Sequence, residues 1–597
     1  MNNSALIYKK LAQHGVKHVF GYSGGAIMPL MDQFHPNNNK DIDLIINSHE
    51  QNCGHAATGY AKSSGKTGIV LVTSGPGITN CITPLLDAKN DSTPLIVISA
   101  NVGLKHIGTN AFQEAPATLI TKPVTKWSHF VTDKDDINYI FEKAFHIAND
   151  GKKGSVHIDI PKCVLNSINK NNNNKRNSNH HNKYLTNYKK NPWRNKNNYI
   201  ASRSFEKLAE IINNSEKPVL YVGQGANSSH LNVRKLSKKF NIPVTTTLHG
   251  MGIFDETDEY SLQMCGMHGH AVANYALQES DCIIALGSRF DDRTTGEISK
   301  YAPKCKKFIH FNIEESEINK VVKTENYVIG DLKKTLPILI NKLENISASK
   351  TLWLKMDVNN IKKMAWINTI QKWKQKFPFD YNETNGLKTQ EVLIELNKQI
   401  TNNMEKYFIT TGVGNHQMMS CQFINWRYPQ RFISSGSLGV MGAGLPYAIG
   451  VQFANQKKSV INIDGDSSFL MTLSDLKTVK EHNLPLKILI LNNGTQDMVR
   501  VWEDLFFEKR ITATENTQGP QFSKLAESFG IKGIKTNKNN LKNNMKYFLD
   551  YKGPILMECI TERDYCFPLV PPGAGLDEMI LNKKNISKID SKANAPS

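Results

Sequence analysis

Short apolar runs alternate with longer stretches of helical pattern along most of the chain. Each apolar run has the length of a buried strand, and the stretches between runs are long enough for crossover helices. This alternation predicts an α/β protein built from three doubly wound parallel-sheet domains of comparable size. The predicted strands lie at residues 18–22, 44–46, 68–73 and 95–100, at 219–222, 282–286 and 308–313, and at 407–411, 459–464 and 486–491.

Two polar stretches separate the three predicted domains. The first contains 14 Asn, eight Lys or Arg and no Asp or Glu, and such a segment cannot bury enough apolar surface to offset its ordering entropy. We therefore expect a solvated linker there, whereas the second stretch is charged and poorly patterned. The predicted parts are domain 1–165, linker 166–200, domain 201–346, linker 347–385, domain 386–580 and tail 581–597.

The composition is that of a globular protein. Of 597 residues, 40% are hydrophobic and 21% are charged, and no run approaches the roughly 20 apolar residues of a membrane span, so we expect no membrane partner. The first 22 residues begin directly with a helix-and-strand pattern, without a signal-peptide core or a Ser- and Arg-rich transit segment. Nine cysteines without a CxxC pair argue against a disulfide framework and a zinc site, and they indicate a reducing compartment.

A net charge of +19 suggests a nucleic-acid partner, but its location weakens that interpretation. Almost half of the excess lies in the low-complexity segment 166–200, and the tail after residue 582 is basic in the same way. The chain shows no recognition helix, RNP-like run or zinc finger. We therefore expect no nucleic-acid partner.

Two polar residues follow neighbouring predicted strands in the last domain. Asp466 comes after the strand 459–464, and Asn493 comes after the strand 486–491. Because the carboxyl ends of parallel strands meet at the ligand face of a sheet, the carboxylate and the carboxamide should lie side by side. Mg²⁺ takes such oxygen ligands and completes its shell with phosphate and water. The pair is a candidate Mg²⁺-diphosphate anchor, and the alternative is ordinary turn chemistry.

A second candidate is Glu50, which follows the predicted strand 44–46 and starts a helix. Small residues at positions 54, 56, 57, 59 and 61 indicate that this helix packs closely against a neighbour. The helix dipole favours the charged form of a carboxylate at this end. Glu50 is therefore either a catalytic carboxylate or an ordinary N-terminal helix residue. Nearby, Gly24, Gly25 and the turn 73–77 let the backbone approach a ligand closely.

Several segments together resemble the thiamine-diphosphate enzymes and, within them, the catalytic large subunits of acetohydroxyacid synthase, also called acetolactate synthase. The resemblance runs from about residue 4 to about residue 580, interrupted by the Asn-rich linker. It implies a pyrimidine-binding domain, a central FAD-binding domain and a diphosphate- and Mg²⁺-binding domain. Besides Glu50, the segments that carry it are 21–26 (GYSGGA), 73–77 (TSGPG), 108–114 (GTNAFQE), 243–248 (PVTTTL), 287–293 (GSRFDDR), 435–442 (SGSLGVMG) and 487–493 (KILILNN).

The resemblance implies how thiamine diphosphate is held. Glu50 would hydrogen-bond N1′ of the aminopyrimidine and favour the tautomer that removes the C2 proton, while the cofactor supplies the electron sink. Met441 resembles the apolar residue that bends the cofactor, although core packing alone would also explain a methionine there. The other implied residues are Gly25, Gln113 and Lys162 for catalysis, Val413, Gly414, Asn415, His416, Gly439, Met471 and Met498 for thiamine diphosphate, and Asp466, Asn493 and the Thr495 carbonyl for Mg²⁺.

The middle domain resembles the part of these enzymes that holds FAD, a flavin that takes no part in their net reaction. Glycine turns after strands suit a dinucleotide pyrophosphate. Phe112, Arg293 and Trp502 match the substrate channel, where Arg293 would pair with a carboxylate and Trp502 would favour the larger second substrate; Arg293 could equally be a surface ion-pair partner. The residues implied for FAD are Gly223, Gly225, Thr246, Leu248, Met267, His268, Gly269, Gly287, Arg289, Asp291, Arg293, Asn312 and Asp331.

Four positions depart from the family pattern. Ser23 replaces the usual Pro, Asn110 an Asp, Asn415 a Gln beside the diphosphate, and Asp497 a Gly. Asp497 would be strained if the backbone there has a positive φ, and its charge would lie near an anionic cofactor. None of the four changes removes a group that performs the chemistry.

The sequence therefore predicts an acetolactate synthase that depends on thiamine diphosphate, Mg²⁺ and FAD and acts on small 2-ketoacids in branched-chain amino-acid synthesis. The resemblance implies a homodimer or tetramer, with or without a regulatory small subunit. The Asn- and Lys-rich composition fits a bacterial cytoplasm or the stroma of a plastid that encodes the protein. Rival interpretations are a pyruvate oxidase, a glyoxylate carboligase, which lacks the carboxylate that Glu50 supplies, and a non-catalytic homologue that binds nucleic acid through its basic linker.

Overall fold

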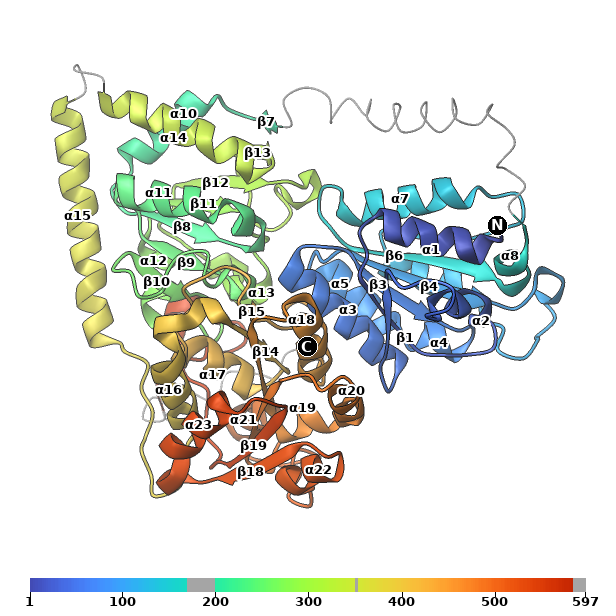
Figure 1. Ribbon diagram of the computed structural model, residues 1–597. Coiled ribbons are helices and arrows are strands. Elements are labelled where there is room, and N and C mark those ends of the chain that lie inside the picture. The colour runs from blue at the N-terminus through green and yellow to red at the C-terminus, as the bar shows by residue number, and fades with distance from the viewer. Residues whose placement is uncertain (169–198, 349–352, 583–597) are drawn as a thin grey trace.

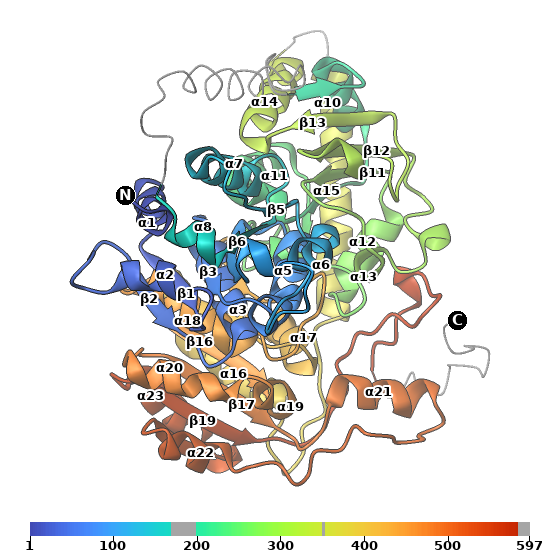
Figure 2. The ribbon, with the colours of Figure 1, turned by 90° about the vertical axis from the view of Figure 1, so that its right-hand side faces the viewer.

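The computed structural model describes residues 1–168, 199–348 and 353–582, which form three α/β domains, each around a mainly parallel sheet (Figure 1). The predicted fold class is confirmed. In both views the middle domain, green to yellow, lies at the top and the C-terminal domain, orange to red, at the bottom (Figures 1 and 2). Most of the predicted solvated linker 166–200 and of the tail 581–597 lies outside the described residues.

The N-terminal sheet is covered by helices on both faces. Ile69 and Leu71 pack on one side with α1 (Asn3–Gln13), α7 (Ile137–Asn149) and α8 (Lys162–Asn166), whereas Val70 and Val72 pack on the other side with α3 (Glu50–Ser64) and α5 (Ile82–Asn90). A strand buried on both faces needs apolar residues at successive positions, which explains the apolar runs. The parallel strand order is β2 (Asp43–Ile46), β1 (His18–Gly21), β3 (Gly68–Val72), β4 (Leu95–Asn101), β6 (Ser155–Pro161) and β5 (Trp127–Phe130).

The middle sheet has the strand order of dinucleotide-binding α/β folds, 3-2-1-4-5-6, with one antiparallel strand added at its edge. One face packs against α10 (Phe205–Asn214), α11 (His230–Phe240) and α14 (Leu332–Ala348), and the other against α12 (Ala271–Glu279). The strand order is β10 (Ser261–Met264), β9 (Val244–Thr246), β8 (Pro218–Val222), β11 (Cys282–Leu286), β12 (Lys307–Asn312), β13 (Asn326–Gly330) and β7 (Tyr199–Ala201).

The C-terminal sheet repeats the strand order of the N-terminal sheet. One face of the sheet packs against α18 (Gly444–Ala454), α20 (Leu476–Glu481) and α22 (Phe522–Ser528). The other face packs against α16 (Thr389–Ile400), α17 (Asn415–Phe423) and α23 (Leu541–Asp550). The parallel strand order is β15 (Phe432–Ile433), β14 (Tyr407–Thr411), β16 (Ser459–Gly465), β17 (Lys487–Asn492), β19 (Ile555–Ile560) and β18 (Lys532–Thr536).

The N-terminal and C-terminal domains share one continuous core, because α3 packs directly on α18. Their backbones meet at two glycines. A Cβ on Gly59 would overlap the backbone of Tyr447, and a Cβ on Gly450 would overlap the carbonyl of Ala56. The small residues of the Glu50 helix therefore serve this close contact.

Each predicted strand is present with its ends within one residue of the prediction, but two connections differ. We expected one crossover helix over 468–482, and the chain instead forms two helices, α19 (Asp466–Leu470) and α20. Between them, Thr472 Oγ1 donates to the Gly442 carbonyl at 2.6 Å, which holds the chain outside a continuous helix. The predicted linker 347–385 contains α15 (Trp353–Lys376), which buries Trp366 and Ile370 against the middle domain. No helix among the described residues is long and apolar enough to cross a membrane.

Candidate active site

The structure places Asp466 and Asn493 side by side at the carboxyl edge of the C-terminal sheet. Gly465 at the end of β16 is paired with Leu491 of β17, so both side chains leave the same edge. The Asp466 carboxylate is buried and accepts hydrogen bonds from Asn516 Nδ2 at 2.9 Å and from the Asn493 backbone. Burial raises the pKa of Asp466, and these hydrogen bonds oppose the rise.

The oxygen atoms at this edge fit a hard cation such as Mg²⁺. Asp466 offers a carboxylate, Asn493 an amide oxygen and Thr495 a backbone carbonyl. Asn493 Oδ1 also accepts the Thr495 N–H at 3.2 Å, so turn chemistry is present in the same residue, and a second lone pair remains for a metal. In the part of the chain that the structure describes, no three His, Cys, Asp or Glu side chains form a metal-binding group, so phosphate and water would complete such a shell.

The neighbouring strand β14 ends in a glycine turn that leads into α17. A Cβ on Gly412 would overlap Asp464 Oδ1, and Gly414 has a φ of +150°, so the turn tolerates no larger residue at either position without strain. Asn415 and His416 open the helix, where backbone N–H groups favour an anion. This helix start fits a diphosphate group.

Residues 434–441, which we term the glycine loop, form most of the connection between β15 and α18. Gly439 is exposed and has a φ of +70°. Met441 is half-buried. Met471 follows α19 and is 58% exposed. These three residues implied for thiamine diphosphate therefore lie on the accessible side of the C-terminal domain.

A cavity of about 1210 Å³, which we term the middle-domain cavity, opens beside the glycine turns of the middle sheet. Residues from both other domains also line it, including Asn90 and Thr93 of the N-terminal domain and Trp502 of the C-terminal domain. Of the residues implied for FAD, it is lined by Gly223, Gly225, Leu248, Met267, His268, Gly287, Arg289, Asp291, Arg293, Asn312 and Asp331, whereas Thr246 and Gly269 lie outside the lining.

The glycines of this cavity lie at the point where the strand order reverses. Gly223 and Gly225 follow β8, Gly287 follows β11, and a Cβ on Gly225 would lie 2.8 Å from the Gly287 Cα. In sheets of this order, dinucleotides bind at that crevice. Ser288 lines the cavity, and its buried hydroxyl has no hydrogen-bond partner among the described residues. The cavity size, the crevice and this free hydroxyl fit a dinucleotide such as FAD.

Two implied residues of the C-terminal domain, Met498 for thiamine diphosphate and Trp502 for the substrate channel, face the same cavity. Met498 and Trp502 are four residues apart on α21 (Asp497–Phe506), so they share a helix face, and both line the cavity. Arg293 also lines it, and its exposed guanidinium lies 3.7 Å from the Asp292 carboxylate. Arg293 is therefore both a cavity residue and a surface ion-pair partner.

The residues implied for the N-terminal domain lie elsewhere. Glu50 is the first residue of α3, and it is largely buried and accepts a hydrogen bond from Asn80 Nδ2 at 3.0 Å. Phe112 is 88% exposed, and Gln113 has a φ of +60° and packs on Gly75. Among the described residues, the lining of the middle-domain cavity does not include Glu50, Gly25, Phe112, Gln113 or Lys162.

Sequence reasoning missed a buried polar group between the domains. Lys62 and His249 both contact the Asp91 carboxylate, and Asp87 lies one helical turn before Asp91. The separation of His249 from Asp91 is 158 residues, so no local pattern links them. The available signal was the pair of carboxylates Asp87 and Asp91, spaced one helical turn apart at the end of α5.

Comparisons with known proteins agree with this geometry. Three family models match: the thiamine pyrophosphate enzyme N-terminal TPP binding domain at residues 1–119, the central domain at 205–339 and the C-terminal TPP binding domain at 412–559. The mitochondrial acetolactate synthase of Schizosaccharomyces pombe is 40% identical over 97% of this chain and 86% of its own length. The chain belongs to the acetolactate synthase family of thiamine pyrophosphate enzymes.

Other relatives give the same result. The mitochondrial acetolactate synthase catalytic subunit of Saccharomyces cerevisiae is 41% identical, over 97% of this chain and 84% of its own. The acetolactate synthase large subunit of Porphyra purpurea is 39% identical, over 96% of this chain and 94% of its own. The similarity therefore spans all three domains.

Two of the four departures from the family pattern contact each other. Asn415 Nδ2 donates to Asp497 Oδ2 at 3.1 Å, and Arg563 Nε donates to the other oxygen at 3.4 Å. Burial raises the pKa of Asp497, and the Asn415 and Arg563 contacts oppose the rise. Asp497 opens α21 without a positive φ, so the backbone strain that we considered does not arise there. Asn110 does have a positive φ, +57°, which Asn tolerates well.

Proposed function

We propose that the protein is the catalytic subunit of an acetolactate synthase, which decarboxylates pyruvate and joins the remaining two-carbon unit to a second 2-ketoacid. Pyruvate as acceptor gives 2-acetolactate and 2-ketobutyrate gives 2-aceto-2-hydroxybutyrate, in the synthesis of valine, leucine and isoleucine. The observation that carries this proposal is the Asp466–Asn493 pair beside the start of α17, in a chain similar over nearly its full length to acetolactate synthases.

The C-terminal edge would hold thiamine diphosphate through Mg²⁺. Asp466, Asn493 and the Thr495 carbonyl would bind the metal, and the N–H groups at the start of α17 would bind the diphosphate. When bound, thiamine diphosphate supplies the electron sink for decarboxylation and carbon–carbon bond formation. Gly439 and Met441 of the glycine loop would orient the ring system.

Glu50 would hold a proton at its free carboxylate oxygen. Asn80 occupies Oε2, which leaves Oε1 to hydrogen-bond a ring nitrogen of the cofactor and so to adjust its protonation. Gln113, Lys162 and Gly25 would complete the N-terminal side of the site. At the cavity, Arg293 would pair with the carboxylate of a 2-ketoacid, and Trp502 would favour the larger acceptor.

FAD would occupy the middle-domain cavity. The reaction combines two 2-ketoacids and releases CO₂ without net oxidation, so the flavin would have no redox step to perform. Its binding would rest on the crevice between Gly223, Gly225 and Gly287 and on the free hydroxyl of Ser288.

A second copy of the chain would complete the site. The Phe112 ring and the Met471 side chain are implied in substrate and cofactor binding, yet they are 88% and 58% exposed. Large apolar side chains that serve a dry active site need a cover. We infer a homodimer, or a tetramer of such dimers, in which the Glu50 edge of one chain faces the Asp466 edge of its partner.

The proposal also includes a regulatory subunit and a cellular compartment. The relatives named catalytic subunit and large subunit have, by those names, a second subunit, and we infer one here. The Asn- and Lys-rich composition, with red-algal and Parasynechococcus relatives, supports a plastid stroma or a bacterial cytoplasm.

A product assay tests the function. Purified protein is incubated with pyruvate, with all three cofactors and with each omitted in turn, and 2-acetolactate and CO₂ are measured. We expect both products in a 1:1 ratio and none without thiamine diphosphate and Mg²⁺. Consumption of O₂ during turnover would indicate an oxidase instead. Absence of product together with salt-dependent DNA binding would indicate a non-catalytic homologue.

A further inference from the structure

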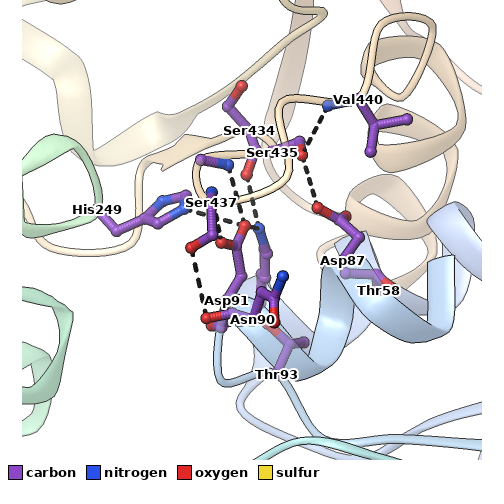
Figure 3. A network of polar contacts seen from close by, with 12 residues as sticks. Thr58, Asp87, Asn90, Asp91, Thr93, His249, Ser434, Ser435, Ser437 and Val440 are labelled. Atoms are coloured by element: carbon purple, nitrogen blue, oxygen red, sulfur yellow. Dashed lines mark hydrogen bonds and ion pairs between the residues drawn. The ribbon is translucent and has the colours of Figure 1, made fainter. Parts of the chain in front are cut away.

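Asp91 joins the three domains at one buried carboxylate (Figure 3). It follows the last residue of α5 in the N-terminal domain. Its Oδ2 accepts hydrogen bonds from Lys62 Nζ at 2.8 Å and from the Gly436 N–H at 3.1 Å, and its Oδ1 accepts the Ser437 N–H at 2.9 Å. His249 Nε2 of the middle domain lies 3.0 Å from Oδ2. One side chain thus contacts elements from every domain.

The same contacts fix the first half of the glycine loop. Lys62 Nζ also donates to the Ser434 carbonyl at 2.6 Å. Ser435 Oγ donates to Asp87 Oδ1 at 2.6 Å and accepts the Val440 N–H at 3.0 Å, which ties the two halves of the loop together (Figure 3). The position of the half that carries Gly439 and Met441 therefore depends on this buried group.

The other side of Asp91 faces the middle-domain cavity. Gln224 Nε2 donates to the Asp91 carbonyl at 2.9 Å, and Arg289 Nη1 donates to the Asn90 carbonyl at 2.9 Å. Gln224, Arg289 and His249 all line the cavity. Any ligand that orders this wall also restrains the end of α5.

The contacts around the Asp91 carboxylate favour its charged form. Burial opposes its ionisation, yet Lys62 and His249 hold the pKa of Asp91 well below its ordinary value. Burial, and then the charge of Asp91, raises the pKa of Asp87. Hydrogen bonds to an ionised acceptor are roughly twice as strong as neutral ones, so a neutral residue at this position would hold the loop more weakly.

We propose that Asp91 is a positioning residue that couples occupation of the middle-domain cavity to thiamine diphosphate binding through the glycine loop. A dinucleotide in the cavity, which loop residues 435–439 also line, orders Gln224, Arg289 and His249. The Asp91 contacts, together with the hydrogen bond from Arg289 to Ser437 Oγ at 2.6 Å, pass this order to the loop that carries Gly439 and Met441. The second cofactor then binds at a smaller ordering cost. The inference rests on the proposed function for the identity of the two cofactors, and it explains how a flavin without a redox step aids the reaction.

Such coupling is reciprocal and measurable without turnover. If FAD tightens thiamine diphosphate binding by some factor, thiamine diphosphate must tighten FAD binding by the same factor. A residue with only a structural role would change both affinities or the stability, but it would leave the ratio unchanged. The coupling factor therefore separates positioning from general support.

The experiment measures this factor in the full-length protein. Thiamine diphosphate with Mg²⁺ is titrated calorimetrically into FAD-free and FAD-saturated protein, and FAD binding is followed by flavin fluorescence with and without thiamine diphosphate. We expect the wild type to show a factor of at least about fivefold and Asp91→Asn less than about twofold. Asp159→Asn is the matched control, because this buried carboxyl of the same domain binds Ser99 and Asn101 instead of the loop. It should keep the wild-type factor.

His249→Ala provides a second test if Asp91→Asn does not fold. It removes the middle-domain contact to the Asp91 carboxylate and leaves Lys62 and both loop N–H groups on that carboxylate, with Gln224 still on the Asp91 carbonyl. Its coupling factor should also fall below about twofold, while the thiamine diphosphate affinity of the FAD-free protein stays within about twofold of the wild type. A wild-type factor near one, or an unchanged factor in either variant, would overturn the inference. Failure to bind either cofactor would instead contradict the proposed function.

Discussion

The N-terminal and C-terminal domains have the same strand order but different chemistry at the same edge. The order is β2-β1-β3-β4-β6-β5 in one and β15-β14-β16-β17-β19-β18 in the other. At corresponding strand ends, the N-terminal domain has a glycine pair and Glu50, whereas the C-terminal domain has a glycine turn, Met441 and Asp466. A shared topology thus leaves function to the residues at the strand ends.

The correspondence extends to the helices that join the two domains. Glu50 opens α3 and Met441 precedes α18, and these two helices pack against each other at Gly59 and Gly450. Within one chain this contact places the two edges on a common core. We infer that the C-terminal edge binds the cofactor, whereas the N-terminal edge adjusts its protonation, and the predictions below test that division.

The largest expected effect comes from Glu50→Gln. Acetolactate formation should fall at least about 100-fold, because the amide cannot hold the required proton. Binding of thiamine diphosphate and the melting temperature should stay near the wild-type values, since Gln keeps the size and still accepts from Asn80. Initial rates, calorimetry and thermal denaturation measure these quantities. Turnover near that of the wild type would remove Glu50 from the chemistry.

Asp466→Ala should act on binding instead. The concentrations of thiamine diphosphate and Mg²⁺ needed for half-maximal activity should both rise at least about tenfold, because the metal joins the protein to the diphosphate. Glu50→Gln is the matched control, with a large loss of rate and little loss of affinity. If Asp466→Ala binds both cofactors normally, the Asp466–Asn493 pair is turn chemistry alone.

Mixing these two variants tests whether the edges meet across chains. Neither homodimer should be active, but a mixed dimer contains one site with both Glu50 and Asp466 intact. Random reassortment makes about half of the dimers mixed, so activity should recover to roughly a quarter of the wild type if the two sites are independent. No recovery after verified subunit exchange would place both residues in one site of the same chain.

The strands were the most predictable part of the fold. Strands buried on both faces, such as β3 and β16, are apolar throughout and stand out from the polar stretches around them. The strands that were not predicted include short or polar ones such as β9, β15 and β18, but also the longer buried strands β6 and β19. The helix α15 was not predicted because it buries few side chains, among them Trp366 and Ile370, so its pattern is weak.

The site was predictable where a few adjacent residues determine it. Strand ends alone indicated Asp466 and Asn493. In contrast, the Asp91 group depends on contacts across 345 residues or more of sequence with the loop at Gly436 and Ser437, and only the packing of α3 on α18 creates them. Sequence also gave no reason to connect Asn415 with Asp497, which are 82 residues apart.

The smallest expected effect tests that last pair. Asp497→Gly, the residue usual in the family, should remove one acceptor from the Asn415 amide, which keeps the Asp564 carbonyl, and one from Arg563, which keeps Asp504. We expect this loss to destabilise the protein by about 0.5–1.5 kcal/mol. Asn415→Gln alone should also destabilise it, because the longer amide must displace the Asp497 carboxylate. If the two departures compensate each other, the double variant should be more stable than the sum of the single effects predicts, by about 0.5–3 kcal/mol. Chemical denaturation of all four proteins measures this coupling, and the Michaelis constant for 2-ketobutyrate shows whether it reaches Met498 and Trp502 on α21. Additive stabilities with unchanged Michaelis constants would mean that the contact is incidental and that α21 is positioned independently of the diphosphate turn.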